Sequence, residues 1–549
     1  MTISISTESI ERIKARLSRV NWPWVIGIAA TILAIIATIY FFAQGLLIAY
    51  GDAESHLNIA KRVVHSLTPG FAQLGGIWLP LPHLLMIPLV FFDKLWRTGL
   101  AGAVISGAAF VVSSIYLFKL TKHITGSLLA SVVAAAVFMS NPNLLYLQST
   151  PMTELVLIAF FVLSTYYFIR FVDDTSKNSY LILAALFGFC ATLSRYDGWF
   201  LVAAEAGLMV LLFLPWSRIP RSFSEIKTGF DKSKWETLQG KLLLFALPAF
   251  FGIALWFLWD FLILGDALYF THSEYSAKSQ QAAWLARGAL PGYNHPIVSF
   301  WYYFVTAMSN AGVLVWVMAL VGLAWYVFRK DSKHRLIVLI ILMVPFIFNV
   351  LTLFLGQSVI FIPHITPVSF EWRLFNVRYG TMMIPAVAFA VGYLMWRLKA
   401  GGKLVVIALL IAQLGLYGIG YSKVISLADG TEGLSSAVSK LPDAQNWIKS
   451  EYDGGLVLVD DFARTLSIVR TDIPMQNIIY VGNKPYWPES LKEPEKYATW
   501  IIMQENDTLW NTLWVPPDMQ GRLYKYFQKV YTSPQILIFK RNPDVQAGT

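Results

Sequence analysis

Three ionisable side chains stand together in residues 50–61, YGDAESHLNIAK, directly after the first long apolar stretch. Asp52 and Glu54 are carboxylates and His56 is an imidazole, so the segment could take a proton from an attacking hydroxyl or supply ligands to a divalent cation. Ionisable groups at membrane depth are costly and usually mark a functional cavity. The segment is therefore the first candidate for a catalytic site.

These residues also have a purely structural interpretation. Asp52 could cap a helix that starts at Ala53, and Glu54 would then lie in the first turn, where negative charge suits the helix dipole. His56 would be a polar helix residue. A carboxylate can cap a helix and also act as a base, so the two interpretations of Asp52 are compatible.

The composition predicts that membrane helices position these residues. Of 549 residues, 56% are hydrophobic and only 14% are charged, whereas soluble domains carry roughly 25% charged residues. Apolar stretches near the roughly 20 residues needed to cross a bilayer recur to about Tyr421. After that point short apolar runs alternate with polar, Pro-containing segments. The single cysteine excludes an intramolecular disulfide and a cysteine-based metal site.

Positive charge in the loops predicts the orientation. Lys and Arg residues precede the first span and recur in later loops, and each of these basic loops is separated from the next by two candidate spans. Because positively charged loops stay in the cytoplasm, the N-terminus and all of these loops are expected there. The apolar run 77–92 is short for a membrane crossing and rich in proline, so we interpret it as a re-entrant or interfacial segment. Because cytoplasmic loops account for the net charge of +10, no nucleic-acid binding is expected.

These rules predict a multi-pass protein of the cytoplasmic membrane with an all-α membrane domain and a small α/β domain. Residues 1–23 would be cytoplasmic, residues 24–421 would form the membrane domain with 50–99 as its first external loop, and residues 422–549 would form an external domain. The predicted spans, about eleven, are 24–49, 100–119, 127–141, 153–170, 179–194, 198–214, 242–264, 300–327, 335–356, 379–396 and 403–421.

The same topology sends further polar residues to the external face. Glu154 lies at the start of a span, Arg195 and Asp197 lie in a short turn, and Arg378 precedes the tenth span. Polar groups from separate parts of the chain would thus converge on one face, which is what an active site at a membrane surface requires.

Several short motifs resemble those of a known class. They are GDAESH after the first span, GGIWLPLPHLL in the first external loop, STPMTELVL, TLSRYDGW at 192–199 and FNVRYGTMMIP at 375–385. Over about residues 20 to 420 the chain resembles the GT-C fold glycosyltransferases, which take a sugar from a polyprenyl-phosphate carrier. It is most similar to the branch with protein O-mannosyltransferases and the aminoarabinose transferase of lipid A, glycosyltransferase family 39.

The resemblance implies a membrane glycosyltransferase that transfers a monosaccharide from a polyprenyl-phosphate donor to a glycan, lipid or protein acceptor on the external face, with inversion. It implies that Asp52 is the catalytic base and that Glu154, where many relatives have Asp, orients donor or acceptor. The resemblance leaves open whether a divalent cation, Mg or Mn, is a cofactor; Asp52 and Glu54 would be its ligands.

The leaving lipid phosphate calls for a fixed cation, and arginine can hold two phosphate oxygens. Arg378 is the first candidate, followed by Arg373 and Arg195. The alternatives are headgroup anchoring for Arg373 and Arg378 and an internal ion pair for Arg195 with Asp197. The expected substrate contacts are Glu54, His56, Asp197, His272 and Tyr379.

Two rival functions fit parts of the pattern. A flippase or transporter of lipid-linked saccharides would carry charged residues throughout the bundle, accessible from both sides, whereas these acids and arginines gather at one end. A noncatalytic assembly subunit would tolerate the loss of Asp52.

Overall fold

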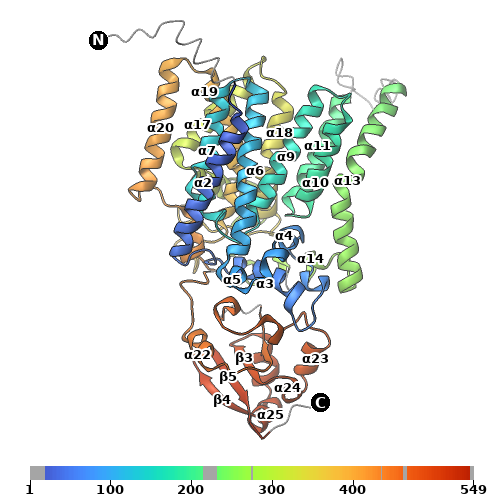
Figure 1. The fold of residues 1–549 in the computed structure, drawn as a ribbon, viewed down its shortest axis with the longest axis vertical. Coiled ribbons are helices and arrows are strands. Elements are labelled where there is room, and N and C mark those ends of the chain that lie inside the picture. Colours follow the sequence, from blue (N-terminus) through green and yellow to red (C-terminus); the bar gives the residue numbers. More distant parts are fainter. Residues whose placement is uncertain (1–18, 214–231, 274–275, 435, 462–465, 545–549) are drawn as a thin grey trace.

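The computed structural model describes residues 19–213, 232–273, 276–434, 436–461 and 466–544, and places a helical bundle above a small α/β domain (Figure 1). Short helices of the loops lie between the two parts. We call the end of the bundle nearest the α/β domain the domain end. The predicted class, an all-α polytopic membrane domain with a small C-terminal α/β domain, is confirmed.

Seven helices in the described part of the chain are long and apolar enough to cross a membrane. The outermost of them expose large apolar side chains such as Leu247 and Leu404, as expected for surfaces in contact with lipid. The seven helices are α2 (Trp22–Ala43), α6 (Leu100–Thr125), α9 (Glu154–Asp173), α13 (Lys232–Leu264), α18 (Arg335–Phe354), α19 (Ile384–Arg397) with the preceding turn η2 (Val377–Met383), and α20 (Ala400–Gly418).

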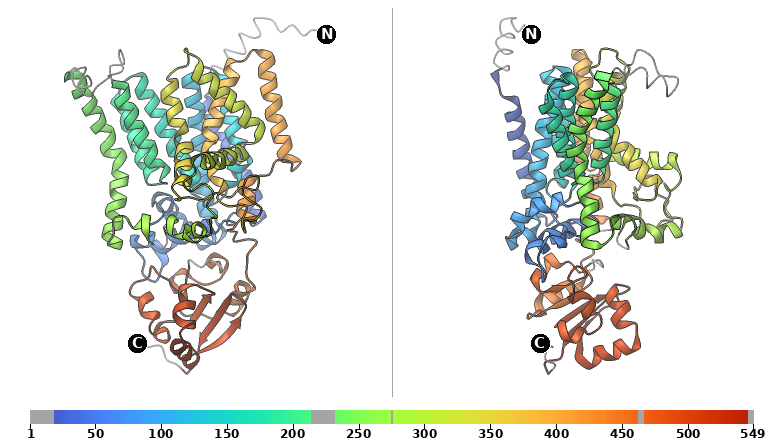
Figure 2. Two further views of the ribbon diagram at one scale, coloured as in Figure 1. Left: turned by 180° about the vertical axis from the view of Figure 1, so that it is seen from behind. Right: turned by 90° about the vertical axis from the view of Figure 1, so that its right-hand side faces the viewer.

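Three shorter helices complete the middle of the bundle. They are α7 (Leu128–Met139), α10 (Asn178–Thr192) and α11 (Asp197–Phe213), and they run beside the longer helices (Figures 1 and 2). All of them coincide with predicted spans, although they are shorter than a full crossing requires.

The prediction of one continuous span at 300–327 was wrong. The chain forms α16 (Pro296–Ala311) and α17 (Val313–Phe328), which meet at an angle of 112°. The break falls at Gly312, whose φ of 86° lies in the left-handed region that glycine adopts readily. Gln413 of α20 fills the space beside this glycine.

The first loop forms a layer of short helices at the domain end. Residues 77–92 contain a ten-residue helix that packs against its neighbours instead of spanning the bundle. The helices of this layer are α3 (Gly51–His65), η1 (Phe71–Leu74), α4 (Leu81–Val90) and α5 (Asp93–Thr98), with α14 (Tyr269–His272) and α15 (Ala277–Ala286) from a later loop.

The C-terminal domain is built on a five-stranded sheet with the order β2-β1-β3-β5-β4. The first three strands in this order are parallel and the other pairings are antiparallel. The central strands are buried on both faces, which their continuous apolar sequences predict. The strands are β1 (Val457–Val459), β2 (Ile478–Ile479), β3 (Trp500–Gln504), β4 (Phe527–Thr532) and β5 (Ile536–Arg541); the helices are α22 (Asp443–Glu451), α23 (Tyr486–Ser490), α24 (Pro494–Tyr497) and α25 (Pro517–Tyr526).

One face of this sheet shares its core with the first loop. Val457 and Ile502 belong to the same apolar cluster as Leu57 of α3 and Trp96 of α5. Polar contacts join the same parts, because Arg62 of α3 forms an ion pair with Asp461. The domain is therefore fixed to the layer that carries the candidate base.

The segment that follows the last long helix packs with the bundle. Helix α21 (Ile425–Glu432) contacts η2 and α8 (Pro142–Leu147). This helix lies within residues 422–549, the segment predicted as the external domain. It packs at the domain end of the bundle before the chain reaches the sheet.

The break at Gly312 gives a stability prediction. Substituting Gly312→Ala forces a left-handed backbone on alanine and places Cβ 2.5 Å from Gln413 Cδ, so we expect a loss of about 1–3 kcal/mol. The measurement is the apparent unfolding temperature in detergent. Gly207→Ala in α11 is the control, because its Cβ meets nothing within 4 Å. Equal unfolding temperatures for the two variants would contradict the role assigned to Gly312.

Candidate active site

A buried arginine at the domain end joins three elements that lie far apart in the sequence. Arg378, only 3% exposed, donates from Nη2 to Asp52 Oδ2 at 2.7 Å and from Nε to Glu154 Oε1 at 3.2 Å. Its Nη1 donates to Asn376 Oδ1 at 2.8 Å and lies 4.0 Å from Asp429 Oδ2. Buried charges of this kind are retained when they are paired and hydrogen-bonded.

The residues around Arg378 lie at the ends of their helices and turns. Asp52 and Glu154 lie in the first turns of α3 and α9, where helix dipoles stabilise negative charge. Helix α3 begins at Gly51 with Tyr50 as its N-cap residue, so the interpretation of Asp52 as the cap was wrong. Asn376, with a φ of 55°, turns the chain into η2 just before Arg378.

A second arginine reaches the same carboxylate. Arg195, in the turn between α10 and α11, donates from Nη1 to Glu154 Oε1 at 3.2 Å and to Thr153 Oγ1 at 3.1 Å. Its Nε lies 3.6 Å from Asp197 Oδ2, so the internal ion pair considered from the sequence is present as well. Glu154 thus bridges two guanidinium groups.

Tyrosine rings line both cations. The Tyr379 ring centroid lies 5.0 Å from the Arg378 guanidinium carbon and 5.1 Å from that of Arg195. The centroid of the Tyr50 ring also lies 5.0 Å from the Arg378 guanidinium carbon. Cation–π contacts of this kind stabilise desolvated charge. We refer to Asp52, Glu154, Arg195, Asp197, Arg378, Tyr379 and Asp429 as the Arg378 cluster.

Sequence analysis missed Asp429 and Tyr50. Asp429 is buried on α21, and Tyr50 Oη donates to Ser426 O at 2.5 Å and lies 3.4 Å from Asp429 Oδ2. Burial raises the pKa of Asp429 to about 6, although Arg378 acts in the opposite direction. The one available signal was an acidic residue soon after the last predicted span, and the assumed domain boundary concealed it.

Glu54 and His56 lie on α3 close to Asp52 but make contacts outside the cluster. Glu54 accepts a hydrogen bond from Val469 N of the C-terminal domain at 3.3 Å, and burial raises its pKa. His56 Nδ1 lies 2.9 Å from His83 Nε2, and burial together with His83 holds the pKa of His56 well below its usual value. Neither side chain was expected to have these partners.

Arg373 and His272 are also engaged elsewhere. Arg373 donates to the carbonyl oxygen of Pro363 within its own loop. His272 is exposed, and its Nε2 lies 2.6 Å from Asp266 Oδ2. The structure therefore joins Asp52, Glu154, Arg195, Asp197, Arg378 and Tyr379 in one cluster, while the other four predicted residues have separate surroundings.

Asp52 and Glu54, the residues suggested as ligands of a divalent cation, have different partners in this structure. Asp52 points to Arg378 whereas Glu54 points to the C-terminal domain, so their carboxylates do not converge. Within the described residues, no three His, Cys, Asp or Glu side chains gather in an arrangement that could hold a metal ion.

The raised pKa of Asp429 predicts a pH-dependent difference in stability. The unfolded carboxyl releases its proton near pH 4 and the folded one near pH 6, so wild type loses stability as pH rises through this window. Asp429→Asn lacks this titration and should gain up to about 3 kcal/mol over wild type between pH 4 and pH 7. Unfolding in detergent at a series of pH values measures the difference.

Asp93→Asn is a control of opposite sign. Burial acts to raise the pKa of Asp93, but its hydrogen bond and ion pair with Lys61 outweigh this effect and lower the pKa. Removing this carboxylate should therefore cost stability at neutral pH, because the ionised form is the stabilised one. A pH-independent difference between Asp429→Asn and wild type would refute the assignment for Asp429.

Comparison with known protein families gives a match over part of the sequence. Residues 89–227 match the family described as dolichyl-phosphate-mannose-protein mannosyltransferase. A comparison with curated protein sequences finds no significant match.

Solved structures give the longer similarity. ArnT from Cupriavidus metallidurans bound to undecaprenyl phosphate aligns at 12% identity, covering 96% of this chain and 100% of that chain with a TM-score of 0.55. Its apo state gives 12% identity, 94% and 98% coverage, and a TM-score of 0.54. These likenesses extend over the bundle and the C-terminal domain alike, and they show that the chain has the GT-C fold of the polytopic membrane glycosyltransferases.

Proposed function

We propose that the protein transfers a monosaccharide from a polyprenyl-phosphate carrier to an acceptor at the domain end of the bundle, with inversion at the anomeric carbon. The observation that carries this proposal is the Arg378 cluster, which combines carboxylates and fixed cations at one end of a membrane bundle. The matches to the mannosyltransferase family and to ArnT bound to undecaprenyl phosphate support the donor class.

Asp52 is the carboxylate best suited to act as the base. Its side chain is 18% exposed, whereas that of Glu154 is fully buried. The acceptor oxygen attacks the anomeric carbon while its proton passes to Asp52. The bond from this carbon to the phosphate oxygen breaks, and the polyprenyl phosphate leaves with the electron pair.

The two arginines have different roles in this proposal. Arg378 is buried and each of its three nitrogens donates to a side chain of the protein, so it holds the carboxylates in position. The Arg195 side chain is 20% exposed, which makes it the better contact for the phosphate that becomes charged as the bond breaks. Glu154 positions both arginines.

An apolar groove next to the cluster suits the polyprenyl chain. Its volume is about 210 Å³, and it lies between the bent pair α16 and α17 and the helices α18 and α19. Phe304 and Trp316 line one side, and Met383, five residues after Arg378, lines the other. Tyr303 of α16, next to Phe304 in the sequence, donates from Oη to Tyr379 O at 3.1 Å and so links that helix to the cluster.

We further infer that the protein lies in the cytoplasmic membrane with its N-terminus in the cytoplasm and its domain end outside. The distribution of basic loops supports this orientation, because positively charged loops are retained in the cytoplasm. The donor sugar would then be used on the outer face.

The role of Asp52 gives the central prediction. Asp52→Asn in nanodiscs, supplied with a panel of polyprenyl-phosphate sugars and membrane extract, should lower transfer about 10²-fold or more because the proton acceptor is lost. Mass analysis of the products measures transfer and identifies the donor. Asp93→Asn, another loop carboxylate that is 64% exposed, should retain activity. Normal turnover by Asp52→Asn would exclude Asp52 as the base. If lipid-linked sugar instead crosses the membrane of proteoliposomes and no sugar is transferred, the result would favour a flippase.

The position of Arg378 gives a second prediction. Because its guanidinium already lies between Asp52 and Glu154, we expect transfer in EDTA to proceed at the rate seen with Mg²⁺. Loss of transfer in EDTA and its recovery with Mg²⁺ or Mn²⁺ would instead require a cation in the reaction.

A further inference from the structure

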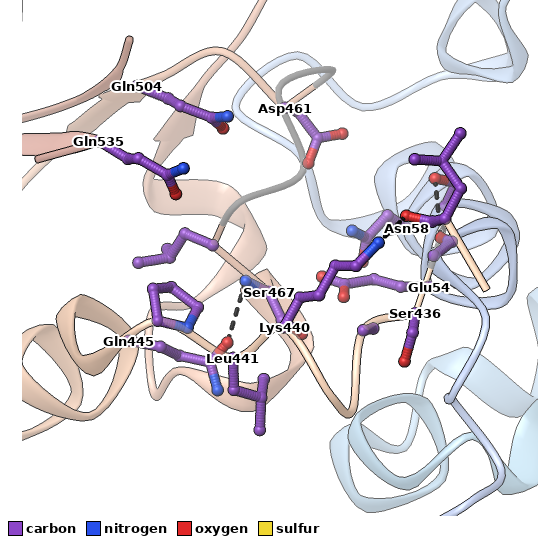
Figure 3. A pocket seen from close by; sticks show the side chains of 16 residues that line it. Glu54, Asn58, Ser436, Lys440, Leu441, Gln445, Asp461, Ser467, Gln504 and Gln535 are labelled. Atoms are coloured by element: carbon purple, nitrogen blue, oxygen red, sulfur yellow. Dashed lines mark hydrogen bonds between the residues drawn. The ribbon is translucent and has the colours of Figure 1, made fainter. Parts of the chain in front are cut away.

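A polar cavity of about 600 Å³ lies between α3 and the C-terminal domain (Figure 3). We propose that this interdomain pocket binds the acceptor and that the acceptor is a neutral, hydroxyl-rich glycan. The inference rests on the proposed function, because it assigns the second substrate of that enzyme. In Figure 3, Glu54 and Asn58 approach the pocket from α3, and Gln504 and Gln535 approach it from the sheet.

Four side-chain amides from separate elements line the wall. Asn58 comes from α3, Gln445 from α22, Gln504 from the end of β3, and Gln535 from the turn before β5. Each amide has both donors and an acceptor, and a sugar hydroxyl likewise both donates and accepts. A wall of amides can therefore meet a series of hydroxyl groups in either hydrogen-bonding direction.

The hydrogen bonds of these amides leave capacity for a ligand. Gln504 Oε1 is buried and has no hydrogen-bond partner among the described residues. A buried acceptor without a donor is costly, so this oxygen favours a ligand that brings a hydroxyl. Gln445 Oε1 accepts from Ser467 N at 3.1 Å and Asn58 Oδ1 accepts from Trp96 Nε1 at 3.2 Å, which holds both amides in fixed orientations.

The charged side chains of the wall already have partners in the protein, and its two carboxylates, Glu54 and Asp461, outnumber its one cation, Lys440. Asp461 forms an ion pair with Arg62, and Lys440 Nζ donates to Gly433 O at 3.2 Å. Glu54 accepts from Val469 N, and burial raises its pKa. A neutral ligand therefore suits the pocket better than a phosphorylated one, and an acyl chain would leave the amides without partners.

The pocket lies next to the segment that carries the proposed base. Gly51 and Ser55 line it one turn apart on α3, and Asp52 follows Gly51 on the adjoining face of the same helix. Ala437 N donates to Ala49 O at 2.7 Å and fixes the opposite wall to the start of the same helix. In the proposal, an acceptor bound here extends past Gly51 to bring a hydroxyl to Asp52, while the donor approaches from the bundle. The volume falls within the roughly 300–1,000 Å³ of ligand sites and accommodates more than one sugar ring.

The test combines binding and kinetics in nanodiscs. Neutral hexose and N-acetylhexosamine oligosaccharides that carry a diazirine are crosslinked to the full chain, and the labelled peptides are mapped by mass spectrometry. We expect labels in peptides that contain Gln445 or Gln504, and we expect these labels to be lost in the Gln504→Ala/Gln535→Ala double variant.

The kinetic test uses the single variants Gln504→Ala and Gln535→Ala. Each should raise the ratio of acceptor KM to donor KM roughly 5- to 10-fold. Gln528→Ala, an exposed amide on β4 outside the pocket, is the matched control.

The outcomes separate the two proposals. If wild type uses no polyprenyl-phosphate sugar, the proposed function fails, while specific glycan labelling of the pocket would still stand as evidence for a glycan site. Labelling that the double variant does not change, or labelling by a Ser/Thr peptide or a lipid probe in place of the oligosaccharides, would overturn the pocket assignment.

Discussion

The structure depends on the pairing of one buried cation. Arg378 lies where the bundle meets the layer of short helices, and its charge is tolerated there because carboxylates from α3, α9 and α21 surround it. Each carboxylate comes from a different part of the chain. Pairing them with one guanidinium fixes the first loop, a membrane helix and the segment after the last span relative to one another.

This constraint also organises the proposed chemistry. Glu154 is shared between Arg378 and Arg195, so the position of the more exposed arginine depends on the buried one. Asp52 is held at its Oδ2 by Arg378 and remains partly exposed. In the proposed reaction the cluster thus presents a base and a cation in a fixed arrangement, which is how preorganised sites lower the cost of charge development.

The C-terminal domain extends the same arrangement. Its sheet shares a core with α3, and Arg62 and Glu54 on that helix contact it directly. The helix that carries Asp52 therefore has one side toward the bundle and another toward the domain. In our proposal the donor and the acceptor approach this helix from these two sides, so the domain serves binding and the bundle serves transfer.

The sequence by itself determined the class of the protein and the identity of the cluster's core. Hydropathy depends on local composition, so the helices were predictable, and the acidic and basic motifs at span ends indicated Asp52, Glu154, Arg195 and Arg378. The bend at Gly312 was missed because an apolar run gives no sign of direction, and only the structure shows that this glycine adopts a left-handed backbone there. Only the tertiary structure decided that Asp429 joins the cluster and that Glu54 and His56 do not. Side chains that are close together on one helix point in different directions. Which of them finds a partner depends on how distant parts of the chain pack around the helix, and the sequence does not show this.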